Sequence, residues 1–247
     1  MTKQGCVIAV GIGPGDAQYR SAQADMALLG ADLICGYSVY VDLVKASYPQ
    51  KEYYSTGMTA ERERCHYALQ EASTGKTVTM VCSGDAGVYG MAGLLYELSA
   101  EYPDVSIDVV PGITAALAGA ALLGAPLSND FVVVSLSNQL TPWETITKRL
   151  HSIGSADIAV CLYNPRSRQR PDNLLLACDI LLQYHSADTP CGIAQNIGRD
   201  GQQTHLLSLQ ELRTYPADMF TTVFVGNSET RILQGKMVAL RGYQSKA

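Results

Sequence analysis

Three short apolar runs in the first half of the chain each lead into a loop that contains glycine. The runs span residues 5–11, 77–82 and 105–110, and the loops that follow them span 11–16, 83–90 and 111–116. A brief apolar run bounded by glycine is typical of a buried strand. Helix-like segments lie between these runs, and a regular alternation of strand and helix is typical of parallel pairing. The first half is therefore predicted to form a mainly parallel sheet with helices on both faces.

The second half has a less regular pattern. In the first half we expect further strands at 32–35 and 52–55 and helices at 21–30, 39–47, 59–73 and 88–101; in the second half we expect strands at 131–135, 157–163, 190–195, 204–208 and 222–226 and helices at 142–152 and 172–184. Two strands, 190–195 and 204–208, follow one another without a helix between them, which indicates a mixed sheet. We predict two α/β domains, residues 1–111 and 112–247, with a ligand cleft between them.

Composition limits the classes of function. Of 247 residues, 47% are hydrophobic and 17% charged, which predicts a large core and excludes disorder. The net charge is −5 and no basic run is present, so we expect no nucleic-acid partner. The longest small, apolar stretch, residues 112–127, is broken by glycine and too short to span a membrane. Seven cysteines without a closely spaced pair, and no expected leader segment, favour a reducing cytoplasm.

The first loop, Gly11-Ile12-Gly13-Pro14-Gly15, only superficially resembles a dinucleotide-binding loop. The dinucleotide fingerprint requires a third glycine where this chain has Asp16, and Pro14 lacks the N–H that a pyrophosphate would bind. A Walker phosphate loop is also excluded, because no Gly-Lys-Ser/Thr follows. The loop is either a tight turn after the first strand or a backbone surface that a bulky ligand approaches closely.

The second loop, residues 83–90, is the most informative because it follows the strongest predicted strand. Its three glycines permit positive φ angles and close approach. Asp85 within it either caps the following helix or hydrogen-bonds a ligand. All three glycine loops follow the carboxyl ends of predicted parallel strands, which is where open α/β sheets bind ligands.

Nucleophile and metal motifs are not found. The chain contains no Gly-x-Ser-x-Gly elbow, and its four histidines (66, 151, 185 and 205) are scattered without ligand spacing. We therefore expect no metal held by the protein, and a reaction that depends on positioning rather than on a protein nucleophile.

Together the three loops resemble the landmarks of the tetrapyrrole methylases, the S-adenosylmethionine-dependent methyltransferases of corrin and sirohaem synthesis. Gly-x-Gly-Pro-Gly, Ser-Gly-Asp-x-Gly-Val-Tyr-Gly and Pro-Gly-Ile-Thr-Ala occur in that family's order and spacing, and the resemblance covers essentially the whole chain. Other segments narrow it to members that methylate ring carbon 17 and contract the macrocycle: 36–40, 56–58, 123–127, 130–131, 135–137, 140–143, 162–168, 225–227 and 241–243. The family's C-terminal Thr-Pro-Arg-Gly-Tyr reads Ala-Leu-Arg-Gly-Tyr at 239–243, without the proline.

The resemblance implies a folded S-adenosylmethionine in the cleft, a tetrapyrrole substrate and a homodimer. Its implied cofactor contacts are Pro14, Gly84, Asp85, Val88 and Tyr89 from the first domain, Thr114 and Ala115 at the methionine part, Tyr163 beside it, and Ala194 and Thr222 facing the adenine. Low charge content is consistent with a buried interface. In-line methyl transfer requires the reacting atoms at roughly 3 Å, and departure of the sulfide from the sulfonium requires no protein acid.

Ring contraction moves protons, so a general acid or base should assist it. The candidate catalytic residues are the polar side chains Ser135, Ser137, Asn138 and Thr141. Their alternative roles are at a strand end and at a helix start, and Thr141 before Pro142 suits a cap.

A polycarboxylate substrate of an acidic protein requires a local cationic patch. Arg166, Arg168 and Arg170 form the dense arginine cluster of the chain and are the candidate substrate-binding residues. The alternative is a solvated loop after a strand.

Several functions remain open at this point. The substrate is either metal-free precorrin-3B or cobalt-factor III, and we favour the cobalt form. Alternatives are a methylase acting at another ring carbon or on another substrate, and a non-catalytic corrinoid-binding protein. A nucleotide-dependent oxidoreductase is disfavoured by Asp16 and Pro14 in the first loop.

Overall fold

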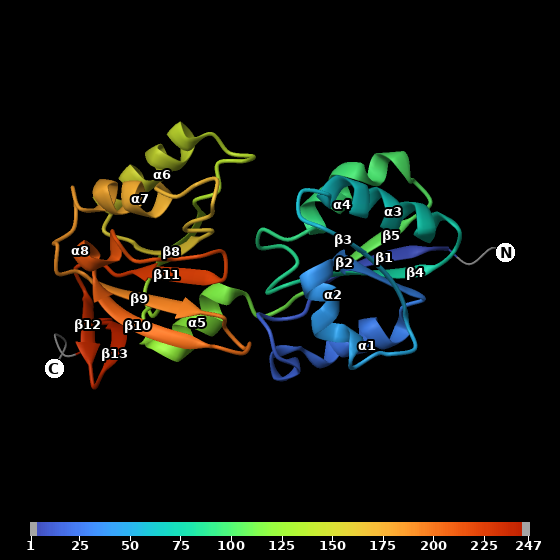
Figure 1. Ribbon diagram of the computed structural model, residues 1–247, viewed down its shortest axis with the longest axis horizontal. Coiled ribbons are helices and arrows are strands. Elements are labelled where there is room, and N and C mark those ends of the chain that lie inside the picture. The colour runs from blue at the N-terminus through green and yellow to red at the C-terminus, as the bar shows by residue number, and fades with distance from the viewer. Residues whose placement is uncertain (1–3, 244–247) are drawn as a thin grey trace. The chain divides into compact units, whose positions relative to one another are not determined.

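A computed structural model describes residues 4–243 of the chain. The chain divides into two compact units, Met1–Ala115 and Ala116–Ala247 (Figure 1). No helix in residues 4–243 is long and apolar enough to cross a membrane.

The first unit is an all-parallel sheet with strand order β3-β2-β4-β1-β5. Its elements are β1 (Cys6–Gly11), η1 (Ala17–Tyr19), α1 (Ala22–Gly30), β2 (Leu33–Tyr37), α2 (Ser38–Lys45), β3 (Glu52–Thr56), α3 (Glu61–Ser73), β4 (Thr77–Cys82), α4 (Ala92–Leu98), η2 (Ser99–Glu101) and β5 (Ser106–Val110). Helices α1 and α2 cover one face of the sheet, and α3 and α4 cover the other (Figure 1).

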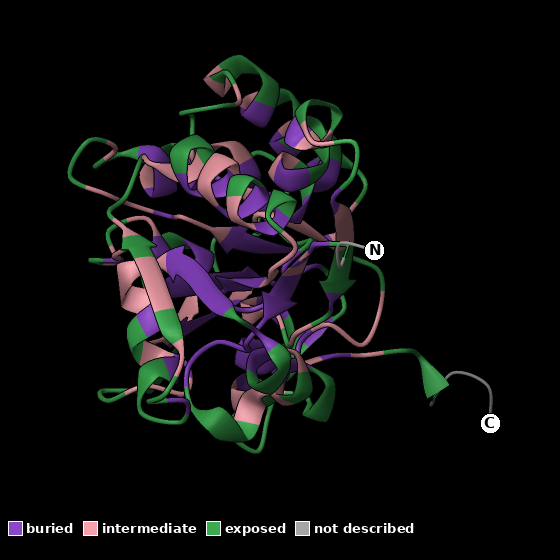
Figure 2. Cartoon of the chain, turned by 90° about the vertical axis from the view of Figure 1, so that its right-hand side faces the viewer, coloured by how far each residue is buried: buried purple, intermediate pink, exposed green. Residues whose placement is uncertain are grey.

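Burial explains why the central strands lie where they do. Five of the six residues of β4 are buried, and β4 and β1 lie between the two helical layers. Figure 2 shows this pattern, with purple central strands and helices whose outer faces are green. An apolar run without alternation is expected for a strand covered on both faces. Helix α1 begins at a clear signal, because the Ser21 hydroxyl accepts a hydrogen bond from the Ala24 amide at 3.1 Å.

The second unit is a mixed sheet with strand order β10-β9-β11-β8-β7, in which only β7 and β8 pair in parallel among the described strands. Its elements are α5 (Ala115–Leu123), β6 (Gly124–Ala125), β7 (Phe131–Ser135), α6 (Trp143–Ser155), β8 (Ala159–Tyr163), α7 (Asn173–Leu181), β9 (Pro190–Gln195), β10 (Gln203–Ser208), α8 (Leu209–Leu212), β11 (Thr221–Val225), β12 (Thr230–Leu233) and β13 (Lys236–Ala239). Helices α6, α7 and α8 pack on one face, and α5 lies on the other (Figure 1).

The predicted fold class is confirmed: the first sheet is parallel and the second is mixed. A small third sheet, β12-β13-β6, was not predicted. Its strands have only two to four residues, and most of β12 is exposed, so the residues give no clear strand pattern. The segment that lacks the family proline is held beside this sheet. The Leu240 amide donates to the Glu229 carbonyl at 3.0 Å, a bond that a proline could not make.

One predicted helix start is wrong, and an alternative role given to Thr141 is not found. The helix expected from residue 88 begins at Ala92, because Tyr89 has φ +54 and Gly90 packs against the Ala86 carbonyl. The alternative role of Thr141 as a helix cap is not found, because α6 begins at Trp143, its N-cap residue is Pro142, and no side chain caps the helix.

Candidate active site

The three glycine loops of the first unit meet at one edge of the sheet, after the adjacent strands β4, β1 and β5. The first two loops pair as a short antiparallel bridge. The Gly13 amide donates to the Gly84 carbonyl at 3.1 Å, and the Gly84 amide donates to the Gly13 carbonyl at 2.7 Å. The first strand is extended by a further bond from the Ile12 amide to the Cys82 carbonyl, at 2.9 Å. The loops therefore form one continuous backbone surface.

The glycines at this edge are required mainly by contacts between the loops. A Cβ on Gly112 would lie 2.2 Å from the Gly84 carbonyl oxygen, and a Cβ on Gly11 would lie 2.6 Å from the Gly112 nitrogen. Gly84 has φ +70 but ordinary space around its Cβ position. The sequence left open a tight turn or an approaching ligand for the first loop; at Gly11 and Gly112 the close neighbour is the chain itself.

Asp85 joins the second loop to the third. Its Oδ1 accepts hydrogen bonds from the amides of Gly87 (2.8 Å) and Val88 (3.1 Å), and its Oδ2 accepts one from the Gly112 amide (2.9 Å). A carboxylate that accepts three N–H groups is a strong local organiser. Asp85 does not cap α4, which begins seven residues later at Ala92.

Two apolar side chains in the second loop face solvent. Val88 is 36% exposed and Tyr89 is 56% exposed. Thr114 and Ala115 are half-buried, and Pro14 is buried in the first loop. This edge thus combines exposed apolar side chains with fixed backbone polar groups, a combination typical of small-molecule sites.

In the second unit, Tyr163 ends β8 and supports the start of α5. Its hydroxyl accepts a hydrogen bond from the Ala116 amide at 2.7 Å, which satisfies one donor in the first turn of that helix. Ala194 and Thr222 are register partners on β9 and β11, and both are buried. Gly119 of α5 packs on Ala194, so these two partners lie deeper in the unit than Tyr163.

The candidate catalytic residues follow β7 and only partly gather. Ser135 accepts hydrogen bonds from the Ser137 amide (3.2 Å) and from Asn164 Nδ2 (2.9 Å). Ser137 is half-buried, and its hydroxyl accepts a hydrogen bond from Arg170. Asn138 is exposed and Thr141 is half-buried, without a side-chain bond to the two serines among the described residues.

Two asparagines that carry this arrangement were not assigned a role from the sequence. Asn164 has φ +52, a backbone conformation that asparagine tolerates better than most residues, and it follows directly after β8. The buried Asn173 donates to the Leu136 carbonyl at 2.7 Å and so fixes the end of β7. The sequence signal for Asn164 was its position between a strand and a proline; Asn173 gave no signal.

One cysteine lies at the strand ends that carry the glycine loops of the first unit. Cys82 ends β4, but burial raises the pKa of its thiol to about 11. The described residues include no group of three or more His, Cys, Asp or Glu side chains that could hold a metal ion.

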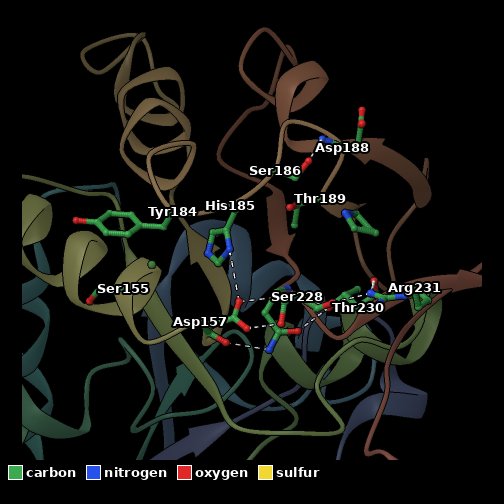
Figure 3. A pocket seen from close by; sticks show the side chains of 13 residues that line it. Ser155, Asp157, Tyr184, His185, Ser186, Asp188, Thr189, Ser228, Thr230 and Arg231 are labelled. Carbon is green, nitrogen blue, oxygen red and sulfur yellow. Dashed lines mark hydrogen bonds and ion pairs between the residues drawn. The ribbon is translucent and has the colours of Figure 1, made fainter.

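A separate hollow of about 480 Å³ lies at the opposite end of β8, around Asp157 (Figure 3). Ser228 donates to Asp157 through both its amide (3.0 Å) and its hydroxyl (2.5 Å), and His185 Nδ1 lies 3.6 Å from the same carboxylate. Burial lowers the pKa of His185, and Asp157 opposes that shift. None of the predicted site residues lines this hollow.

An all-parallel sheet with glycine loops after its strands, followed by a mixed sheet, is an α/β arrangement of the kind that commonly carries small-molecule sites at its strand ends. The chain belongs to the tetrapyrrole (corrin/porphyrin) methylases, whose family model matches residues 6–213. It is a methyltransferase.

Two relatives and one solved structure illustrate the similarity. The probable cobalt-factor III C(17)-methyltransferase of Salmonella typhimurium is 45% identical over 95% of this chain and 98% of its own length. The precorrin-3B C(17)-methyltransferase of a Sinorhizobium species is 36% identical over 93% of this chain and 92% of its own. The crystal structure of the methyltransferase CobJ has a TM-score of 0.89 and 34% identity, and covers 96% of this chain and 100% of that one.

Proposed function

We propose that this protein transfers a methyl group from S-adenosylmethionine to carbon 17 of a tetrapyrrole and contracts the macrocycle, as a step of corrin synthesis. The observation that carries the proposal is similarity along nearly the whole chain to relatives named for C(17) methylation, at 45% and 36% identity. The relative named for cobalt-factor III is the more similar of these two, which favours the cobalt-containing substrate.

The loop edge of the first unit suits this cofactor. A sulfonium nucleoside has apolar, polar and cationic parts, and the edge offers the exposed Val88 and Tyr89, backbone groups and the Asp85 carboxylate. Gly87 adds open space, since a Cβ there would meet only Asp85 Oδ1, at 3.3 Å. Pro14, Gly84, Thr114 and Ala115 complete the proposed surface. When bound, the cofactor supplies an electrophilic methyl group.

In the second unit, we assign Tyr163 a place beside the cofactor and Ala194 and Thr222 a place near the adenine. Tyr163 is half-buried and its ring is fixed by the bond from Ala116, which supports the first assignment. Ala194 is 0% exposed and Thr222 is 6% exposed, so we expect them to form the floor of the adenine site.

Substrate carboxylates require cations, and the loop after β8 provides them. Arg166 is half-buried and Arg168 is exposed, and neither has a hydrogen bond or ion pair with another residue of the described chain. A guanidinium without a protein partner suits bidentate binding of a carboxylate. The net charge of −5 therefore does not oppose an anionic substrate.

Two further expectations accompany the function. A homodimer is proposed from the family resemblance, and sedimentation velocity would test it. A reducing compartment is proposed because all seven cysteines are free and six of them are buried.

The test is incubation of the purified protein with isotopically labelled S-adenosylmethionine and each candidate tetrapyrrole. We expect label in the product from cobalt-factor III, with less or none from metal-free precorrin-3B. Label in a product of unchanged ring size would support another methylase of the family. Tight corrinoid binding without transfer of label would support a carrier and contradict the proposal.

A further inference from the structure

Arg170 differs from the other two arginines of its loop because its side chain is already bonded. One terminal nitrogen donates to the Ser137 hydroxyl oxygen, and Nε donates to the Ser167 hydroxyl at 3.1 Å. No carboxylate lies within ion-pair distance of Arg170 in the part of the chain that is described. Arg170 therefore directs its charge at a hydroxyl group instead of at an acid.

Both partners of the Arg170–Ser137 bond are held in place. The backbones of Ser167 and Arg170 exchange two hydrogen bonds, of 3.2 and 3.0 Å, so a tight turn fixes the base of the arginine. The Ser137 amide donates to Ser135, and the preceding carbonyl accepts from Asn173. The interaction joins the segment after β7 to the loop after β8, two neighbouring strands that run in parallel.

The direction of the bond determines what Ser137 can do next. A guanidinium only donates, so Arg170 must use a lone pair of the Ser137 oxygen. The hydroxyl hydrogen then points away from the arginine, and the positive charge polarises the O–H bond. Ser137 thereby becomes a stronger and better oriented hydrogen-bond donor than a serine solvated by water.

We propose that Ser137 donates a hydrogen bond to a carboxylate or carbonyl oxygen at the edge of the tetrapyrrole, and that Arg170 is the positioning residue that orients and polarises this hydroxyl. The inference rests on the proposed function. Ser137 keeps its proton, and no covalent bond forms or breaks on the protein. A donor fixed in this way stabilises an oxygen that gains negative charge while the ring rearranges. Arg166 and Arg168 remain the cations that bind substrate carboxylates.

A double-mutant cycle tests the coupling. We expect Ser137→Ala and Arg170→Met each to lower kcat on the tetrapyrrole by about 10- to 100-fold. The double variant should be no slower than the slower single variant, since Arg170 then has no hydroxyl to orient. The matched control combines Ser137→Ala with Arg168→Met, a nearby arginine without a bond, and there the two effects should multiply. Multiplying effects for Ser137 and Arg170 would overturn the proposal.

Two further measurements separate positioning from a general structural role. Arg170→Lys keeps a cationic donor and should recover part of the kcat lost in Arg170→Met. The affinity for S-adenosylhomocysteine and the unfolding transition of Trp143 fluorescence should be the same in all variants. No recovery by lysine, or a loss of folding that parallels the loss of kcat, would contradict the assignment. If the wild-type protein methylates no tetrapyrrole, both the proposed function and this inference fail. If the wild-type protein is active but the effects of the Ser137 and Arg170 substitutions multiply, only this inference fails.

Discussion

Replacing Asp85 by alanine would remove the carboxylate that ties the second glycine loop to the third. The Gly87 and Val88 amides lie in an exposed loop, where water can replace the carboxylate, so each lost bond should cost about 1 kcal/mol. The Gly112 amide is partly buried and would be left without its acceptor, which should cost about 2 kcal/mol. We therefore expect the free energy of unfolding of the first unit to fall by about 4 kcal/mol.

Asp85→Asn is the matched variant, since it preserves shape but replaces one acceptor oxygen by an NH₂ group. Whichever way the amide turns, its nitrogen faces a backbone N–H, so we expect a loss of about 2 kcal/mol. The affinity for S-adenosylhomocysteine should fall in the same order, alanine more than asparagine, because the loops that form the proposed cofactor surface are loosened.

Amide hydrogen exchange measures this effect locally. Residues 83–90 and 111–115 should exchange faster in both variants, and urea unfolding followed by circular dichroism should begin earlier. Trp143 is the one tryptophan of the sequence and lies in the second unit, so its fluorescence transition serves as an internal control. Unchanged exchange and unfolding would refute the reasoning that Asp85 holds the two loops together, and a loss of ligand affinity would then have to come from its direct contact with the ligand.

Three other predictions follow from contacts, charge and burial. Gly112→Ala should destabilise the first unit by about 3 kcal/mol or more, because the new Cβ would lie 2.2 Å from a carbonyl oxygen. Gly84→Ala should cost about 1 kcal/mol, from its positive φ alone. Equal urea midpoints for the two variants would contradict this difference. Burial lowers the pKa of His185 in the folded protein below its ordinary value of 6.5. Between the lowered pKa and 6.5 the unfolded chain binds more protons than the folded protein, so the free energy of unfolding should fall as the pH drops through this window. His185→Gln should flatten the pH dependence of the urea midpoint, and an unaltered slope would count against this role of His185. Arg166→Ala should weaken tetrapyrrole binding in titrations without altering the affinity for S-adenosylhomocysteine. The control is Arg149→Ala, an exposed residue on α6, which should alter neither affinity. An unchanged tetrapyrrole affinity in Arg166→Ala would reject a substrate-binding role for Arg166.

The parts of the fold that the sequence predicted well are those dominated by burial. The predicted bounds of β4, β7 and β9 agree with the structure because each is a compact apolar run bounded by turn residues. The short strands β12 and β13 were missed because four residues are too few for a clear strand pattern, and most of β12 is exposed. The late start of α4 was missed because it depends on the positive φ of Tyr89 and on the packing of Gly90 against the Ala86 carbonyl, which helix propensity does not indicate.

The site was predictable to the level of loops but not of contacts. The glycine motifs indicated which strand ends carry the site, whereas the reason for glycine at 112 is a backbone 28 residues away in sequence, at position 84. Likewise, three clustered arginines gave no sign that Arg170 is bonded to Ser137 while the other two are not. Contacts between residues that are distant in sequence decide these roles, and periodicity does not encode them.

The most direct test of the central claim is carbon-13 NMR of the product formed from S-adenosylmethionine labelled in its methyl group. With cobalt-factor III as substrate, we predict a single enriched methyl signal on carbon 17 of a contracted macrocycle. An enriched methyl at another ring carbon, or no enriched tetrapyrrole although both ligands bind, would contradict the account.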